Sequence, residues 1–236
     1  LGIEVNEENR RSYRDMLLTT NSLSNYISGA ILFDETIRQK TTEGKSFPKY
    51  LNEIGIIPGI KVDTGAKPFS CHKNEKITEG LDNLPQRMDE YSNLGAKFAK
   101  WRAVITIGED IPSSACMVAN AHALARYASI CQAVDIVPIV EPEVLMDGSH
   151  DINKCFEVTN ITQSILFEAL DKLNVNFSGI ILKPNMVTSG SSCKTQSSAE
   201  EISELTIKSL ENNVPKDVPG IAFLSGGQSD ECASNN

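Results

Sequence analysis

Short apolar segments alternate with amphipathic helical patterns along the whole 236-residue chain, and this alternation limits the fold more than any other feature. Six segments rich in Ile and Val are typical of buried strands: residues 28–33, 57–63, 98–105, 135–143, 178–184 and 219–226. From the second segment onward their ends recur about every 40 residues, the length of one strand, one helix and their loops. This alternation predicts an α/β fold with a parallel sheet.

Helical periodicity fills the intervals between these segments, and it is found in five stretches: residues 7–18, 78–95, 112–134, 153–174 and 197–213. The architecture is then either a doubly wound sheet or a (β/α)8 TIM barrel. Neither a GxGxxG motif nor a Walker loop follows a strand, so a nucleotide-binding doubly wound sheet loses its main support.

We therefore predict one (β/α)8 barrel domain over residues 1–236. Six strands are visible, whereas a closed barrel of this class has eight. The chain opens on a helical pattern and stops at GGQSDECASNN, which is typical of the start of a further helix. We expect the barrel to be incomplete at both ends, with about one strand missing from each.

Composition excludes several classes of function. The net charge of −9 and the pI near 4.9 argue against a nucleic-acid partner. No apolar stretch approaches the length of a membrane span, and the charged start LGIEVNEENRR is not a signal peptide. The six cysteines are scattered without a CxxC pair, which favours a reducing compartment. We expect a cytoplasmic protein.

Charged and glycine residues gather where the predicted strands end, which is where (β/α)8 enzymes form their active sites. In chain order these strand-end residues are Lys61, Asp63, Lys100, Arg102, Glu141, Glu143, Lys183, Ser225, Gly226 and Gly227. Each has a structural explanation when it is taken alone: Lys61 as a solvated strand end, or Glu141 as an ion-pair partner of Arg102. Their combination at successive strand ends predicts one shared site.

Lys183 is the least expected of these residues, because it follows the aliphatic run Ile180, Ile181 and Leu182. A buried ammonium is costly unless it is paired or loses its proton, and a neutral lysine is a nucleophile. The three histidines are isolated, with no HxH or HExxH pattern, so the sequence predicts neither a metal site nor a cofactor.

The motifs GIKVD, FAKWR, VPIVEPE, ILKPNM and LSGGQS, in this order and spacing, resemble the class I fructose-1,6-bisphosphate aldolases, and EENRRSYRDMLLT and LARYASICQ extend the match over essentially the whole chain. The resemblance implies a metal-independent lyase of glycolysis that is a cytoplasmic homotetramer. Such an enzyme cleaves a phosphorylated sugar, fructose 1,6-bisphosphate, to dihydroxyacetone phosphate and glyceraldehyde 3-phosphate through a Schiff base, and it catalyses the reverse condensation. It also implies cytoskeletal proteins as further partners.

The resemblance also implies roles for the strand-end residues. Lys183 matches the Schiff-base lysine, Glu141 the acid/base that dehydrates the carbinolamine, and Lys100 the lysine that stabilises charge near the reacting carbons. The remaining strand-end residues form the candidate substrate-binding set: Lys61, Asp63, Arg102, Glu143, Ser225, Gly226 and Gly227.

Three motifs of the family are not found in the sequence: an Ala-Ala-Asp-Glu-Ser strand, a Tyr-Gly-Arg strand and a C-terminal tyrosine. Two alternatives therefore stay open. One is a non-catalytic aldolase-derived fragment or scaffold that acts through protein binding, and the other is a different Schiff-base barrel, such as a transaldolase-like enzyme. Retention of Lys183 and Glu141 favours catalysis over a scaffold, and the FAKWR and LSGGQS motifs argue against the other barrels.

Overall fold

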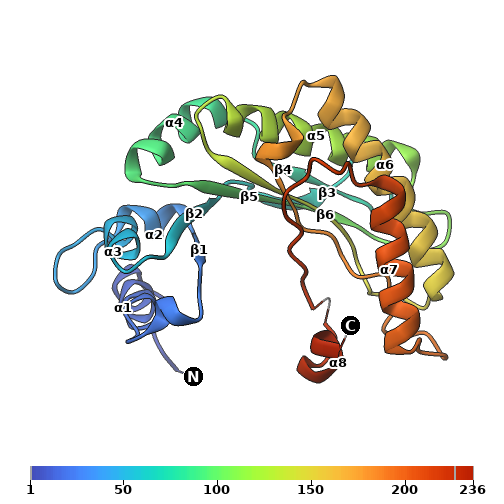
Figure 1. Cartoon of the computed structure of the whole chain (residues 1–236), viewed down its shortest axis with the longest axis horizontal. Coiled ribbons are helices and arrows are strands. Elements are labelled where there is room, and N and C mark those ends of the chain that lie inside the picture. The colour runs from blue at the N-terminus through green and yellow to red at the C-terminus, as the bar shows by residue number, and fades with distance from the viewer. Residues whose placement is uncertain (1, 226, 236) are drawn as a thin grey trace.

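The computed structural model describes residues 2–225 and 227–235, without the side chains of Cys232 and Asn235. Its main feature is a parallel five-stranded sheet of order β1-β2-β5-β6-β7. The strands are β1 Gly29–Leu32, β2 Ile57–Lys61, β5 Phe98–Ile105, β6 Val137–Val144 and β7 Ile181–Leu182. Neighbours in the sheet follow one another in the same order along the chain, as in a (β/α)8 barrel. Over the described residues the sheet is an open arch with β1 and β7 at its edges (Figure 1).

Helices follow the strands and cover one face of the sheet, with α4, α5 and α6 on the outside of the arch (Figure 1). The helices are α1 Glu7–Leu18, α2 Asp34–Arg38, α3 Phe47–Glu53, α4 Leu84–Leu94, α5 Ser114–Gln132, α6 Ile152–Lys172, α7 Ala199–Asn213 and α8 Asp230–Asn235. Side-chain oxygens cap the longest ones: Ser113 accepts from the backbone N–H of Cys116 at 3.1 Å and Asp151 from that of Lys154 at 2.8 Å. None of the described helices has the combination of length and hydropathy that a membrane span requires.

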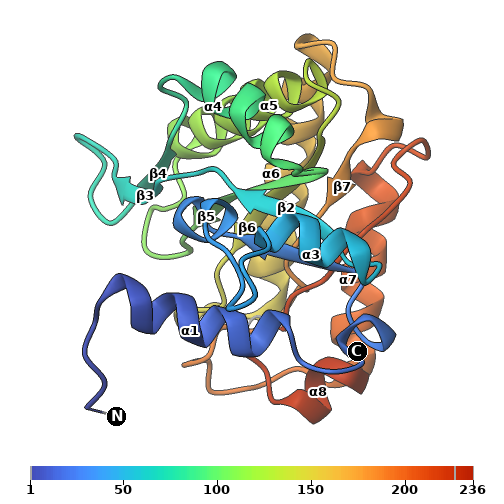
Figure 2. The ribbon, with the colours of Figure 1, turned by 90° about the vertical axis from the view of Figure 1, so that its left-hand side faces the viewer.

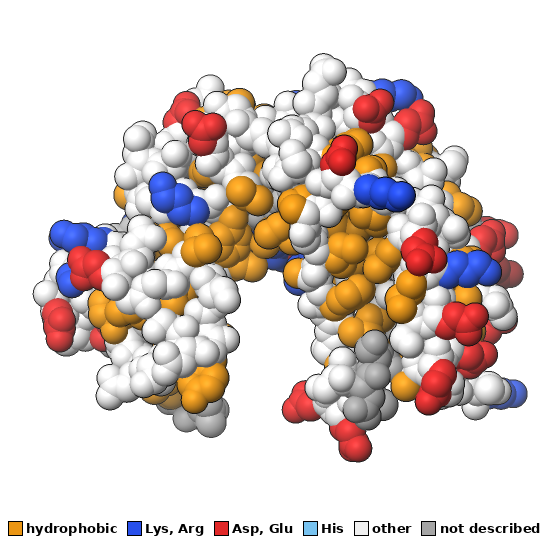
Figure 3. All heavy atoms as spheres, in the orientation of Figure 1, with side chains coloured by type: hydrophobic (Ala, Val, Ile, Leu, Met, Phe, Trp, Pro, Cys, Tyr) orange, Lys and Arg blue, Asp and Glu red, His pale blue; other side chains and the backbone are white. Residues whose placement is uncertain are grey.

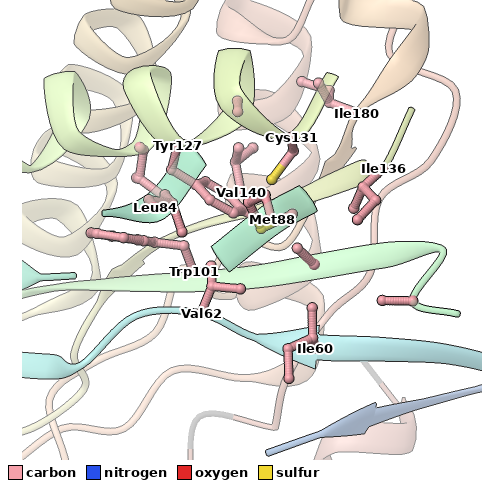
Figure 4. Close-up of a cluster of buried hydrophobic side chains, with 14 of the residues drawn as sticks. Ile60, Val62, Leu84, Met88, Trp101, Tyr127, Cys131, Ile136, Val140 and Ile180 are labelled. Atoms are coloured by element: carbon pink, nitrogen blue, oxygen red, sulfur yellow. The ribbon is translucent and has the colours of Figure 1, made fainter. Parts of the chain in front are cut away.

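The main core lies between the sheet and the α4–α5 layer (Figure 4). Trp101 of β5 is fully buried there, and its ring stacks on that of Tyr127 from α5 with the centroids 5.5 Å apart. The Tyr127 hydroxyl donates to the carbonyl of Ile139 at 3.2 Å, which ties α5 to β6. Lys100 and Arg102 flank Trp101 in the sequence. Because side chains alternate along a strand, these two residues point to the opposite face of the sheet.

Four of the six predicted strands are confirmed with the same or slightly different bounds, the fifth is shorter than predicted, and the sixth is wrong. The segment 178–184 contributes only β7, because Phe177–Gly179 form a 3₁₀ turn and Pro142 of β6 has no N–H to continue the pairing beyond Lys183. The segment 219–226 forms a single parallel bridge between Ile221 and Leu182 rather than a strand, and Gly226 lies outside the described residues. The ladder stops there because the next donor on that side of β7 would be Pro184.

The predicted helix 78–95 is wrong at its start. Residues Lys76–Glu79 form strand β4, which pairs in antiparallel fashion with β3, Gly65–Pro68, in a hairpin that projects beside the sheet (Figure 2). Asn120 of α5 fixes this hairpin by accepting from the backbone N–H of Thr78 at 3.1 Å. That contact spans 42 residues, so local periodicity could not indicate it. The other predicted helices, and a helix near the C-terminal end, are confirmed.

Replacement of Trp101 by alanine tests how much the sheet depends on this core. The fully buried indole leaves a cavity between β5 and α5, so the free energy of unfolding should fall by about 3–5 kcal/mol. Urea denaturation measures the change. The control is Val118→Ala on α5, where the side chain is 51% exposed. Equal losses for the two substitutions would contradict this account of the core.

Candidate active site

Four neighbouring strands, or the residues directly after them, supply the charged residues of the site. Because β2, β5 and β6 run parallel, their register sets Lys61 opposite Lys100 and Arg102 opposite Glu141. Lys183 directly follows β7 on the far side of β6, and its backbone N–H donates to the carbonyl of Val140 at 2.8 Å. The sheet therefore presents charged side chains from successive strands at one end, as the strand-end positions predict.

Glu141 lies between two ammonium groups at the centre of this array. One carboxylate oxygen, Oε1, accepts a hydrogen bond from Lys183 Nζ, and the other, Oε2, lies 3.0 Å from Lys100 Nζ. The Glu141 side chain is only 2% exposed, so its charge depends on these two cations for compensation. The Lys100 contact is a charge contact without hydrogen-bond alignment, which leaves Oε2 able to accept a proton, or a hydrogen bond from a hydroxyl group, of a ligand.

Arg102 and Glu143 form a second pair next to the first. Arg102 Nε donates to Glu143 Oε2, and this hydrogen bond is the main cause of a raised pKa for the guanidinium. The Glu143 side chain is buried, whereas that of Arg102 is 43% exposed. Arg102 is thus held in place by a buried carboxylate while its planar head stays accessible, which suits the binding of a carboxylate or a phosphate.

Lys61 and Asp63 form a third pair at the end of β2. Lys61 Nζ lies 2.6 Å from Asp63 Oδ1 and 2.8 Å from the Asp63 carbonyl oxygen. The buried Asp63 carboxylate also accepts from the backbone N–H groups of Gly65 at 3.0 Å and Arg102 at 3.4 Å. These bonds give Asp63 a structural role, because they connect the loop after β2 to β5.

A cavity of about 660 Å³ opens above the Glu141 cluster. Its lining residues are Lys100, Arg102, Glu141, Glu143, Leu145, Met146, Asp147, Lys183, Ser191, Leu224, Ser225 and Gly227. Seven of the predicted site residues are thus brought together here, whereas Lys61 and Asp63 lie outside the described lining and Gly226 outside the described residues. In Figure 3 the molecule is hollowed between its N-terminal helices and α7–α8, and hydrophobic side chains gather along the wall of the hollow.

Sequence reasoning missed five lining residues: Leu145, Met146, Asp147, Ser191 and Leu224. The first three directly follow β6, so the strand-end rule could have found them. Ser191 gives no such signal. It is brought to the cavity because its backbone N–H donates to the carbonyl of Met146 at 2.7 Å, joining the loop after Lys183 to the loop after β6.

The chemistry open to this site follows from its groups. A primary amine in contact with a buried carboxylate can attack a carbonyl carbon and exchange protons with that carboxylate. Lys100 and Arg102 add positive charge at the cavity wall, although the chain as a whole carries −9. The cavity therefore favours an anionic carbonyl compound as ligand.

Comparison with known proteins agrees with this geometry. The family model "Glycolytic: Fructose-bisphosphate aldolase class-I" matches residues 1–236. A "Probable fructose-bisphosphate aldolase class 1" of Xanthomonas campestris is 62% identical over 231 residues, which are 98% of this chain and 69% of that protein. "Fructose-bisphosphate aldolase 1" of Toxoplasma gondii is 51% identical over 238 residues, which are 100% of this chain and 66% of that protein.

A solved structure gives the same result for the fold. The fructose-bisphosphate aldolase of Plasmodium falciparum, crystallised in complex with TRAP and a small-molecule inhibitor, superposes with a TM-score of 0.95 at 47% sequence identity. The match covers 99% of this chain and 68% of that one. The predicted TIM-barrel fold class is thereby confirmed, with the described strands as consecutive strands of the barrel. The chain belongs to the class I fructose-bisphosphate aldolase family.

Proposed function

We propose that this chain is a glycolytic lyase that cleaves fructose 1,6-bisphosphate to dihydroxyacetone phosphate and glyceraldehyde 3-phosphate, and joins them in reverse, through a Schiff base on Lys183. The observation that carries the proposal is the contact of Lys183 with a buried Glu141 whose second oxygen faces Lys100. Family membership supports the reaction, and the cavity above the cluster supports the position.

The reaction requires an electron sink for the electron pair of the bond that breaks. When the C3–C4 bond breaks next to the C2 ketone, its electron pair must be accepted, and a protonated imine at C2 accepts it well. The Lys183 amine attacks C2 and gives a carbinolamine, which loses water to form the imine. The C4 hydroxyl then gives its proton to a carboxylate of the site, the aldehyde product leaves, and the electron pair of the broken bond forms the C2–C3 double bond of an enamine. Protonation of the enamine at C3 and hydrolysis of the resulting imine by water release dihydroxyacetone phosphate and restore the lysine amine.

Glu141 is suited to the proton transfers of these steps. It already contacts the Lys183 nitrogen through Oε1, so it can take a proton from the attacking amine and return one to the departing hydroxyl. Lys100, 3.0 Å from Oε2, offsets the negative charge that remains on the carboxylate and on the reacting oxygens.

The other candidates suit the anionic substrate. Arg102, oriented by Glu143, presents a guanidinium at the cavity wall, and Ser225 and Gly227 bring a glycine-rich loop to the same cavity. Backbone N–H groups of such a loop, to which Gly226 also belongs, suit a phosphate dianion. We assign Lys61, held by Asp63 at the neighbouring strand end, to the second phosphate of an extended bisphosphate.

We further infer a cytoplasmic homotetramer, built on one barrel domain. The described free cysteines fit a reducing compartment, and an Arabidopsis thaliana relative, 48% identical, is named a cytosolic aldolase. Cytoskeletal partners stay a prediction from the resemblance alone. A non-catalytic scaffold is not favoured by any observation, because such a scaffold would gain nothing from a lysine paired with a buried glutamate at a cavity.

Borohydride trapping tests the nucleophile. In the presence of dihydroxyacetone phosphate, reduction should fix one ligand irreversibly to the Lys183 nitrogen, because borohydride converts the imine to a secondary amine. Peptide mass spectrometry locates the adduct. Lys183→Met should abolish labelling, whereas Lys172→Met, at an exposed lysine of α6, should leave it unchanged. An adduct on any other lysine would refute the assignment.

Glu141→Gln tests the proton-transfer role. The amide keeps the size of the side chain but cannot accept the proton of the amine, so kcat should fall by about 10²-fold or more. Steady-state cleavage of fructose 1,6-bisphosphate measures the change. The matched control is Glu157→Gln, which removes an exposed carboxylate paired with Lys154 at 3.0 Å and should leave kcat unaltered. Similar kcat values for the two variants would exclude Glu141 as the acid/base.

Chelation tests the electron sink. An imine takes the place of a Lewis acid in accepting electrons, so aldol cleavage should persist at full rate after dialysis against EDTA. The assay is the same cleavage reaction before and after treatment. Activity that disappears with EDTA and returns with added zinc would show that the protein uses a metal instead of the Lys183 imine.

A further inference from the structure

The backbone ladder between β6 and β7 ends just before the proposed catalytic pair. The two strands pair at only two positions, Ile139 with Ile181 and Val140 with Leu182, and the last backbone hydrogen bond runs from Lys183 N–H to the Val140 carbonyl. Alternate residues of β6 face β7, so the next groups on that side belong to Pro142. A proline has no N–H to donate to the segment after β7, so the ladder cannot continue in the normal way.

The side chain of Asn185 takes over where the ladder stops. Its Oδ1 accepts from the backbone N–H of Val144 at 3.0 Å, the position where a regular parallel ladder would use a backbone carbonyl of the neighbouring strand. Its Nδ2 donates to Thr159 Oγ1 of α6 at 3.1 Å and to the Met186 carbonyl at 3.0 Å. Asn185 is 4% exposed, so water cannot replace these bonds easily.

These bonds span the two segments that carry the reacting groups. Asn185 is two residues beyond Lys183, and Val144 directly follows Glu143 and is three residues beyond Glu141. The Asn185–Val144 bond therefore holds the segment after β7 against the end of β6 on the side where Pro142 interrupts the ladder. The bond to Thr159 fixes the same carboxamide to the helix layer behind the sheet.

We propose that Asn185 is a positioning residue that sets the distance and angle between the Lys183 amine and the Glu141 carboxylate. The part of this inference that concerns catalysis rests on the proposed Schiff-base function. Asn185 itself does not line the cavity in the part of the chain that the structure describes, so its effect passes through the backbone to Lys183. A displacement of about 1 Å at a reacting group can cost about 10²-fold in rate.

Asn120 provides a matched control. It is 1% exposed, its Oδ1 accepts from the Thr78 N–H at 3.1 Å, and its Nδ2 donates to the carbonyls of Lys76 at 2.9 Å and Cys116 at 3.1 Å. Like Asn185, it accepts one backbone N–H bond and donates bonds through Nδ2 between a strand and a helix, but it lies far along the chain from Lys183 and outside the described cavity lining. If the effect came only from the general loss of buried hydrogen bonds, substitution at either position should slow the reaction at Lys183 equally.

The test compares Asn185→Leu with Asn120→Leu, both of which keep the approximate side-chain volume and remove the bonds. Hydrogen exchange at the Val144 amide should accelerate about tenfold or more in Asn185→Leu only. Borohydride trapping of dihydroxyacetone phosphate on Lys183 should slow about 10²-fold in Asn185→Leu and less than about threefold in Asn120→Leu. Equal slowing in both variants, or unchanged trapping in Asn185→Leu, would overturn the proposal.

A second readout separates this proposal from the proposed function. Reductive methylation of Lys183 by formaldehyde and cyanoborohydride needs no aldolase reaction, and its rate depends on how Glu141 holds the amine. If the wild-type protein forms no adduct with dihydroxyacetone phosphate, the proposed function fails. The methylation rates of Lys183 then test by themselves whether Asn185 positions the amine. A change of about threefold or more in Asn185→Leu but not in Asn120→Leu supports positioning, and equal rates refute it.

If Asn185→Leu does not fold, Asn185→Asp replaces it. The carboxylate keeps an acceptor for the Val144 N–H but loses both donated bonds and faces the Met186 carbonyl. We expect trapping and methylation at Lys183 to change by at least about threefold, and unchanged rates in this variant would overturn the inference.

Discussion

A buried carboxylate held between two ammonium groups is the interaction on which the rest of this structure depends. Glu141 has lost nearly all contact with water, and desolvation of a charge costs several kcal/mol unless partners compensate for it. Lys183 and Lys100 supply that compensation from the strands on either side. The parallel sheet is what makes this possible, because its register sets one member on each of three adjacent strand segments, Lys100 of β5, Glu141 of β6 and Lys183 directly after β7.

The same strands must satisfy two opposite requirements. On the face that meets α4 and α5, Trp101 and Val140 are fully buried in an apolar core. On the other face, the residues next to them in sequence, Lys100, Arg102 and Glu141, are polar and face the cavity. The period of two along a strand resolves the conflict, since it separates the core-forming and the charged side chains without changing the backbone. The rigid core then holds the charged groups in fixed positions, as a catalytic site requires.

Sequence reasoning could find the parts of this arrangement that depend on local pattern. The strand–helix alternation gave the α/β class, and strand ends with period-two charges gave Lys100, Arg102, Glu141, Glu143 and Lys183. The family resemblance added their roles, which stay proposals until they are measured.

The parts that it missed depend on contacts between distant segments. The β3–β4 hairpin is fixed by Asn120 across 42 residues, and Ser191 reaches the cavity only through the loop after β6. Two prolines limit the last pairings: Pro142 ends the ladder between β6 and β7, and Pro184 ends the pairing of β7 with the 219–226 segment. Asn185 was visible in the KPNM motif, but its bond to Val144 requires knowledge of the β6–β7 register.

A crystal structure of the protein after soaking with dihydroxyacetone phosphate shows directly whether Lys183 forms the covalent intermediate. We predict continuous electron density from Lys183 Nζ to C2 of the ligand, with Glu141 Oε1 within hydrogen-bond distance of the new C–N bond and Lys100 near Glu141 Oε2. A ligand that lies in the cavity without a covalent bond while Lys183 stays paired with Glu141, or a ligand joined to Lys100, would contradict this prediction.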